Sequence, residues 1–106
     1  MYMYILEKSE QVDTWLRKLK DIKAKAKILA KLKMAELGNL GNHKYIGNGL
    51  SEMIIDYGPG YRLYYTKISG VLLLLLIGGD KSSQSKDIAK AKIIIKNFEV
   101  KDENES

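Results

Sequence analysis

Residues 58–83 read GPGYRLYYTKISGVLLLLLIGGDKSS, and this stretch decides the fold. Gly58-Pro59-Gly60 predicts a tight turn, because proline fixes φ and glycine permits positive φ. The alternation that follows predicts a strand over 61–67, with Arg62 and Tyr64 together on one of its two faces. Residues 71–77 are apolar on both faces, which indicates a central strand that is covered on both sides. The stretch therefore predicts two strands followed by the start of a helix.

The rest of the chain adds helices before and after these strands. Ser9 is placed to cap a first helix, and Asp21 a second one that ends before Gly38. The two helices follow each other without a long loop, which favours a helical hairpin. Ser82 or Ser83 would cap the last helix. Strands are expected at 2–6, 44–46, 50–57, 61–67 and 71–77, and helices at 10–19, 22–37 and 83–98.

Apolar spacing predicts which helix faces are buried. In the first helix Trp15 lies on the apolar stripe, so we expect it to anchor the core. For the second helix the main stripe is expected at Ile22, Ala26, Leu29, Lys33 (its stem) and Leu37, widened by Ile28, Leu32 and Ala35. For the last helix it is expected at Ile88, Ala91, Ile95 and Phe98. The order β-αα-ββββ-α, with glycine-punctuated strands 8–12 residues apart, favours an α+β fold with an antiparallel meander.

Length and composition limit the function classes. The 106 residues suffice for one domain, which we place at residues 1–100, with a disordered acidic tail at 101–106. The absence of Cys excludes a disulfide framework and thiolate metal sites, and fits a reducing cytoplasm. A single His excludes a His-cluster metal site. The longest apolar run, 71–77, is far shorter than the ~20 residues of a membrane span, and no signal peptide is evident. We expect a cytoplasmic protein without metal or cofactor.

Positive charge is concentrated in one part of the chain. The net charge is +5, yet residues 17–33 hold eight basic side chains and one acid, Asp21. Lys20, Lys23, Lys27 and Lys31 recur every three or four residues, so they form one lysine stripe on the second helix. Such basicity fits a polyanion or an acidic protein as partner. A solvated basic surface that only keeps the protein soluble fits the charge equally well.

Individual motifs leave alternatives open. Gly78-Gly79-Asp80-Lys81-Ser82-Ser83, between a strand and a helix start, is either a phosphate site made of free amides or an ordinary turn with a serine cap. Arg62 suits bidentate phosphate contact, or an ion pair to Glu52 or Asp56 across the hairpin. His43 is a candidate acid or base, although a lone exposed His more often has no role.

Taken together, three segments resemble a known family. They are 38–44 (GNLGNHK), 58–65 (GPGYRLYY) and 78–84 (GGDKSSQ), followed by Asp87-Ile88. In this order and spacing, the chain resembles the RelE/ParE superfamily of bacterial type II toxin–antitoxin toxins, nearest to its HigB-like, phage-related addiction module killer branch. The resemblance implies a helical hairpin on a mostly antiparallel sheet and a C-terminal helix. It also implies a metal-independent, ribosome-dependent mRNA endonuclease neutralised by an antitoxin, expected to be a small helix-turn-helix DNA-binding protein.

The resemblance also implies roles for individual residues. The 2′-hydroxyl of the mRNA attacks the adjacent phosphate, and positioned cations stabilise the charge that develops. Arg62 is then the phosphate-stabilising residue, with Lys81 and Lys44 as further phosphate contacts. Glu52 and Tyr64 are weaker catalytic candidates, and no general base is assigned. Contacts with RNA or the ribosome are expected from Lys20, Lys23, Lys27, Lys31, His43 and Tyr61.

The chain departs from the family pattern at three positions. Ile54 stands where an arginine is usual, Asn42 replaces the usual Asp, and Lys27 replaces an Arg. Two other hypotheses stay open. One is a non-enzymatic inhibitor of DNA gyrase of the ParE type, because that fold is shared and no general base is evident. The other, based on Ile54, is a degenerate toxin that retains only antitoxin binding.

Overall fold

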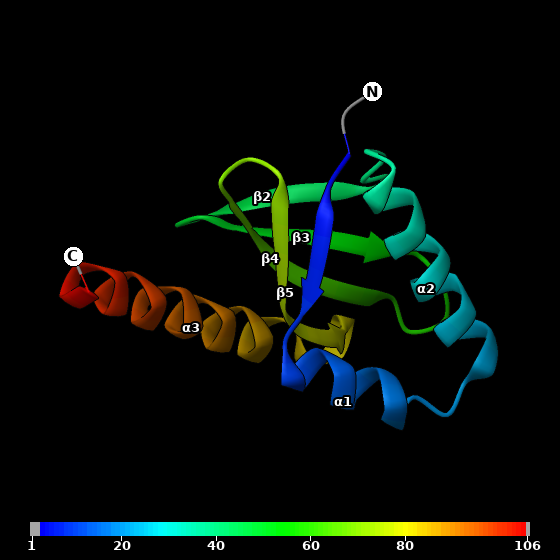
Figure 1. The fold of residues 1–106 in the computed structure, drawn as a ribbon. Helices are drawn as coiled ribbons and strands as arrows, with labels where there is room; N and C mark the ends of the chain where they lie inside the picture. The colour runs from blue at the N-terminus through cyan, green and yellow to red at the C-terminus, as the bar shows by residue number, and fades with distance from the viewer. Residues whose placement is uncertain (1–2, 106) are drawn as a thin grey trace.

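A computed structural model describes residues 3–105, with side chains described from residue 3 to 98 (Figure 1). The chain has an α+β fold, and the predicted order of elements is confirmed. The elements are β1 (Ile5–Lys8), α1 (Glu10–Lys18), α2 (Ile22–Glu36), β2 (His43–Gly47), β3 (Leu50–Ile55), β4 (Tyr61–Ile68), β5 (Leu72–Asp80), the 3₁₀ turn η1 (Lys81–Ser83) and α3 (Gln84–Glu105).

The strands form one sheet in the order β1-β5-β4-β3-β2. Strands β2 to β5 make the expected antiparallel meander, whereas β1 pairs in parallel with β5. The pairing of β4 with β5 shifts register between Tyr64 and Tyr65, so that Tyr64 lies opposite Ile77 and Tyr65 opposite Leu75. Leu76 is therefore the extra residue of a β-bulge.

Helices cover both faces of the sheet, so there are two cores. Helices α1 and α2 pack on one face against Met53, Leu63 and Leu73, while α3 packs on the other against Tyr64 and Leu76. Strand β5 contributes buried side chains to both cores, which confirms the prediction from its unbroken apolar run. Alternation along β4 is also as predicted, because Tyr61, Leu63 and Tyr65 enter the first core and Tyr64 the second.

Both predicted N-caps of the first two helices are confirmed. The side chain of Ser9 accepts from the amide of Val12, and that of Asp21 accepts from the amide of Ala24. The close helical hairpin is not confirmed. Helix α1 packs on β5 and β1, and α2 packs on β1 and β3, and the two run in clearly different directions (Figure 1). Each helix is thus held by the sheet.

The predicted main stripe of α2 is wrong. Its buried residues are Ala24, Ile28, Leu32 and Ala35, whereas Ile22, Leu29 and Leu37 are exposed. The helix carries apolar residues on two sides, and periodicity alone does not say which side meets the sheet. In α1, Trp15 packs against the first core but is only partly buried.

Several predicted boundaries shift. Strand β1 begins at Ile5, because its partner residues on β5 start at Leu72; Tyr2 lies outside the described residues. Strand β5 continues to Asp80, and the cap before the last helix comes from Asp80, whose side chain accepts from the amide of Ser82. Helix α3 does not stop at residue 98 but continues to Glu105.

The sequence after residue 98 explains the longer helix. Residues 99–105 contain no Gly or Pro that would end a helix, and they include the helix formers Lys and Glu. Side chains beyond residue 98 lie outside the described ones, so the disorder of the tail at 101–106 stays a prediction. Of the residues predicted on the buried stripe of α3, Ala91 and Ile95 are buried as expected, whereas Phe98 is exposed.

Candidate active site

An acid and an arginine form a pair on the sheet face that α3 partly covers. Glu52 on β3 is only 4% exposed, and its Oε2 lies 3.8 Å from Nε of Arg62 on β4. Glu52 and Arg62 are diagonal neighbours, since Glu52 pairs with Tyr64 and Arg62 pairs with Ile54. The ion pair that the sequence left as one alternative for Arg62 is therefore formed, with Glu52 as the partner.

Strand register arranges this face in two adjacent rows. The first row crosses the sheet as Lys44, Glu52, Tyr64 and Ile77. The second row is Ile54, Arg62 and Gly79. Residues directly opposite in an antiparallel pair point to the same side, so Lys44 shares the face of Glu52 and Arg62. Ile54 is the direct neighbour of Arg62, at the position where the resembled family has a second arginine.

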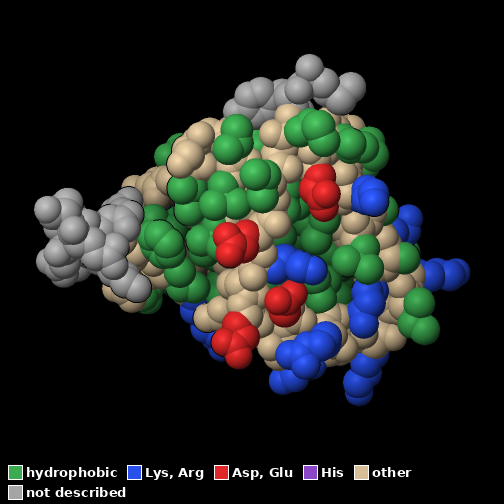
Figure 2. Space-filling view, in the orientation of Figure 1, with side chains coloured by type: hydrophobic (Ala, Val, Ile, Leu, Met, Phe, Trp, Pro, Cys, Tyr) green, Lys and Arg blue, Asp and Glu red, His purple; other side chains and the backbone are tan. Residues whose placement is uncertain are grey.

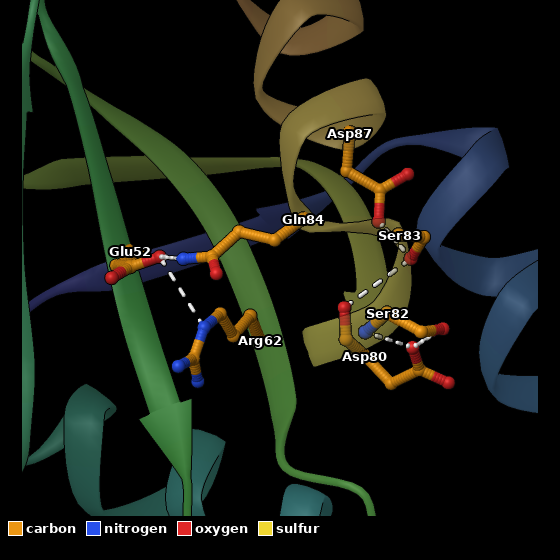
Figure 3. Close-up of polar contacts among 7 residues, drawn as sticks. All are labelled: Glu52, Arg62, Asp80, Ser82, Ser83, Gln84 and Asp87. Carbon is orange, nitrogen blue, oxygen red and sulfur yellow. Dashed lines mark hydrogen bonds and ion pairs between the residues drawn. The ribbon is translucent and has the colours of Figure 1, made fainter.

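A third residue, Gln84, contacts the Glu52 carboxylate from a helix. It is the first residue of α3, and its Nε2 donates to Oε2 of Glu52 at 3.4 Å (Figure 3). Arg62 and Gln84 thus converge on the same carboxylate oxygen of Glu52. Figure 3 also shows the two terminal nitrogens of Arg62 directed away from Gln84. Sequence reasoning missed this role, although Gln84 ends the recognised segment 78–84; only the fold brings it to Glu52.

Tyr64 lies beside Glu52 on the same face of the sheet and is fully buried. Among the described residues its hydroxyl has no hydrogen-bond partner, and the same holds for Nε of Arg62, which is within ion-pair distance of Glu52. Burial raises the pKa of Tyr64 well above its usual value. The carboxylates of Glu52 and Asp87 raise this pKa further, and Arg62 partly offsets them. Tyr64 is therefore a protonated phenol at neutral pH.

The two glycines at 78–79 are part of β5, so they do not form a loop between the strand and the helix. They are required by packing on opposite faces. A Cβ at Gly78 would fall 2.3 Å from the ring of Trp15, and a Cβ at Gly79 would fall 1.9 Å from Oδ2 of Asp87. Asp87 is buried and accepts from Oγ of Ser83 at 2.6 Å. The Gly-Gly pair thus lets α1 and α3 approach β5 closely from its two sides.

Asp80 occupies the place that a bound anion would need. Its Oδ1 accepts from the amide of Ser82 at 2.8 Å and also from the Ser82 hydroxyl. These hydrogen bonds, with that to the Ser82 side chain the strongest, lower the pKa of Asp80 below its usual value although partial burial opposes them. A carboxylate already at these amides disfavours a phosphate there, and the cap comes from Asp80 in place of the expected Ser82 or Ser83.

The remaining predicted residues fall in different places. Lys81 is exposed in η1, and its Cβ lies beside Gly60. Tyr61 is buried in the other core, edge-on to Trp15, so it is not available to RNA. Burial is also the main reason why the pKa of Tyr61 is raised. His43 pairs with Met53 and so points to the α2 side of the sheet, where its Nδ1 lies 2.8 Å from the carbonyl of Gly41.

The lysine stripe of α2 is separate from the Glu52–Arg62 pair. Lys20, Lys23 and Lys27 are exposed, and Lys and Arg side chains gather over α1 and α2 (Figure 2). The ammonium of Lys27 lies 5.2 Å from the centre of the Tyr57 ring. Lys31 is partly buried and donates to the carbonyl of Asn42 at 3.3 Å, and burial lowers the pKa of Lys31.

Within the described part of the chain, no set of three or more His, Cys, Asp or Glu side chains is placed to bind a metal ion. No helix in the same residues is long and apolar enough to cross a membrane.

Comparisons with known proteins bear on the fold and the family. No protein-family model matches the chain. An uncharacterized protein of Haemophilus influenzae (strain ATCC 51907 / DSM 11121 / KW20 / Rd) is 51% identical over 82 residues, which are 77% of this chain and 83% of that protein. The solved structure of a mutant of the E. coli toxin RelE in the free state matches with a TM-score of 0.65. It is 22% identical and covers 84% of this chain and 94% of the RelE chain.

Proposed function

The chain belongs to the same family as the uncharacterized Haemophilus influenzae protein and has a RelE-like toxin fold, and from this premise we propose that it is the toxin of a type II toxin–antitoxin module. We propose that it cleaves mRNA on the ribosome in the cytoplasm, without metal or cofactor. Its partner would be an antitoxin encoded beside it, of the small helix-turn-helix DNA-binding kind.

The observation that carries the proposal is the setting of Arg62. The buried carboxylate of Glu52, itself contacted by Gln84, forms an ion pair with Nε on one side of the guanidinium group, and no hydrogen bond from its terminal nitrogens is found among the described residues. Arginine offers planar, paired donors that match the oxygens of a phosphate. An arginine that is held in place but still has donors to offer loses little entropy when it binds a phosphodiester.

The proposed reaction uses the RNA's own nucleophile. The 2′-hydroxyl oxygen forms a bond to the adjacent phosphorus while the bond from phosphorus to the 5′-oxygen breaks, leaving a 2′,3′-cyclic phosphate and a 5′-hydroxyl. The proton lost by the 2′-hydroxyl is balanced by one gained at the 5′-oxygen. Negative charge grows on the phosphate oxygens in between, and Arg62 stabilises it.

Two lysines are proposed to assist Arg62. Lys44 on β2 and Lys81 after β5 belong to the strands on either side of the β3–β4 pair, so they can bind the RNA backbone before and after the scissile phosphate. Glu52 is assigned to orienting Arg62, because its Oε2 already receives Arg62 and Gln84. Tyr64, a neutral phenol beside Glu52, is proposed to support this pair. The lysines at 20, 23, 27 and 31, of which Lys31 is partly buried, are proposed to dock the protein on ribosomal RNA together with His43.

Cleavage of a reporter mRNA on purified translating ribosomes, mapped by primer extension, tests the proposal. Wild-type protein should cut, and Arg62→Ala should lower the cleavage rate by at least 100-fold, the usual effect of losing one electrostatic donor. Arg17→Ala is the matched control, since Arg17 is the second arginine and is exposed on α1. Equal cleavage by wild type and Arg62→Ala would remove Arg62 from the site. Absence of cleavage by wild type would reject the endonuclease.

The register at Ile54 favours a second candidate function. The side chain opposite Arg62 is apolar, so this row offers the phosphate one guanidinium where the resembled family has two. A toxin with weak or lost cleavage would then act by binding, either to DNA gyrase or only to its antitoxin. Ile54→Arg should restore or increase mRNA cleavage if a degenerate site is the reason. Arrest of gyrase supercoiling by the wild type, with intact transcripts, would instead support gyrase as the target.

A further inference from the structure

Helix α2 has an apolar face that the fold leaves uncovered. Its buried face meets the sheet through Ala24, Ile28, Leu32 and Ala35. The other face carries Ile22, which is 82% exposed, Leu29 and Leu37, each 47% exposed, and the small Ala26. A hydrophobic side chain that meets only solvent contributes nothing to the core. A whole row of them on one helix is unusual for a surface that stays free.

The spacing of these residues makes them one continuous strip. Ile22, Ala26, Leu29, Lys33 and Leu37 follow the i, i+4, i+7, i+11, i+15 pattern of a single helix face, and the stem of Lys33 can extend the apolar surface. At 1.5 Å per residue the strip is about 22 Å long, which matches about four turns of a second helix. Figure 2 shows hydrophobic side chains exposed between the Lys and Arg side chains over α2.

A hollow borders the strip on one side. It lies between α2 and the end of β3, has a volume of about 360 Å³, and is lined by Ala30 and Met34 of α2 together with Lys27 and Tyr57. Met34 is itself 45% exposed. A partner lying along α2 could therefore place a larger side chain in this hollow, which a flat helix face would not accept.

Charge decides what kind of partner fits. Helix α2 contains Lys23, Lys25, Lys27, Lys31 and Lys33, and Glu36 is its one acid. A second copy of this chain would bring the same lysines face to face, which is repulsive. RNA would neutralise the lysines but offers Ile22 and Leu29 no apolar surface. We propose that this face binds an acidic amphipathic helix of a protein partner, with apolar anchors on the strip and Asp or Glu side chains against the flanking lysines.

This binding would also have a regulatory effect, and that part rests on the proposed function. A helix on the strip would cover Lys23 and Lys27, which belong to the lysine stripe assigned to ribosome docking. The partner would thus prevent docking without touching Arg62.

Titration of the ¹⁵N-labelled full-length protein with a designed peptide tests the docking surface. The probe is an 18-residue helix former with Leu at the i, i+4, i+7 and i+11 positions and Glu on the flanks. A matched peptide carries Lys in place of every Glu. The Glu peptide should shift the amide signals of α2 and bind more weakly as salt is raised, and the Lys peptide should leave the spectrum unchanged. Equal binding of both peptides, or shifts confined to other elements, would overturn the proposal.

Variants on the strip separate it from other apolar surface. Ile22→Gln combined with Leu29→Gln should weaken the Glu peptide at least 10-fold. Ile93→Gln on α3, where Ile93 is 59% exposed, is the matched control and should change the affinity less than twofold. If the free protein dimerises and the strip variants abolish this dimerisation, a second copy of the chain is the occupant. A short RNA that shifts the Ile22 and Leu29 amides while the peptide does not would identify RNA. Either outcome would overturn the proposal, and neither depends on mRNA cleavage.

Discussion

Adding one methyl group at Gly79 is expected to release α3 from the sheet. In Gly79→Ala the new Cβ would lie 1.9 Å from Oδ2 of Asp87 and 2.8 Å from Oγ of Ser83. Atoms not bonded to each other attract at about 3.5 Å or more, so the Asp87 carboxylate must retreat by roughly 1.5 Å. The backbone of β5 imposes no strain of its own here, since Gly79 is not among the residues with positive φ. The effect is therefore purely one of space.

The size of the effect follows from what the retreat disrupts. Overpacking a tight contact costs about 1–3 kcal/mol. The Ser83–Asp87 hydrogen bond of 2.6 Å would be lost, and hydrogen bonds to charged groups contribute about 1.5–3 kcal/mol. Because relaxation reduces both contributions, we expect the free energy of unfolding to fall by about 3 kcal/mol. For a domain of this size that corresponds to a decrease in Tm of about 15 °C.

Urea denaturation followed by Trp15 fluorescence and by circular dichroism measures this change. A double-mutant cycle with Asp87→Ala gives the sharper result. Without the carboxylate the clash largely disappears, so Gly79→Ala should cost at least 1 kcal/mol less in that background. Gly79→Ala should also weaken mRNA cleavage, since Gln84 in the first turn of α3 loses its place beside Glu52. A change in unfolding free energy below about 0.5 kcal/mol, or perfect additivity in the cycle, would refute the reasoning.

Three further predictions address single groups. Tyr64→Phe should leave the free energy of unfolding unchanged or raise it by up to about 1 kcal/mol, because the change removes a buried hydroxyl that lacks a partner among the described residues. A clear decrease in the unfolding free energy measured by urea denaturation would contradict this prediction. Asp21→Ala should destabilise by about 1 kcal/mol through loss of the α2 cap, while Asp21→Asn, which can also cap, should not; equal losses would argue against capping. Because the pKa of Asp80 is lowered in the folded state, the ionised Asp80 carboxylate stabilises the fold at pH values above the usual Asp pKa, and this stabilisation is lost as the pH falls through the lowered pKa. The difference in unfolding free energy between wild type and Asp80→Asn should therefore shrink between pH 5 and pH 2. A constant difference over this range would contradict the linkage.

Much of the architecture was predictable because it is encoded locally. Ser9 and Asp21 cap helices through side chains that reach only three residues along the chain. The turn at Gly58-Pro59-Gly60 and the alternation in β4 likewise depend on neighbouring residues. Apolarity on both faces of β5 predicted that it would be covered on both sides, which the two cores confirm.

The features that the sequence did not predict depend on contacts between segments that are distant in the chain. The two glycines at 78–79 resemble a loop in the sequence, but their reason is the approach of Trp15 and Asp87 from opposite sides. Gln84 lies 32 residues from Glu52 in the sequence, so its role became visible only when α3 was seen to cross β4. In α2, two apolar stripes compete, and the choice between them is made by the sheet.

The parallel pairing of β1 with β5 also has a consequence for the timing of synthesis. Ser9 bonds to the carbonyl of Leu76 across 67 residues of chain, and Ile5 pairs with Leu72 over the same interval. At a synthesis rate of about 5–20 residues per second, the first strand waits about 3–13 s before its neighbour exists. Strand β4, which carries Arg62, is completed only near the end of this wait and then still lacks β5 on one side. The site proposed around Arg62 is therefore complete only once β5 and Gln84 have been made, late in the synthesis of the chain.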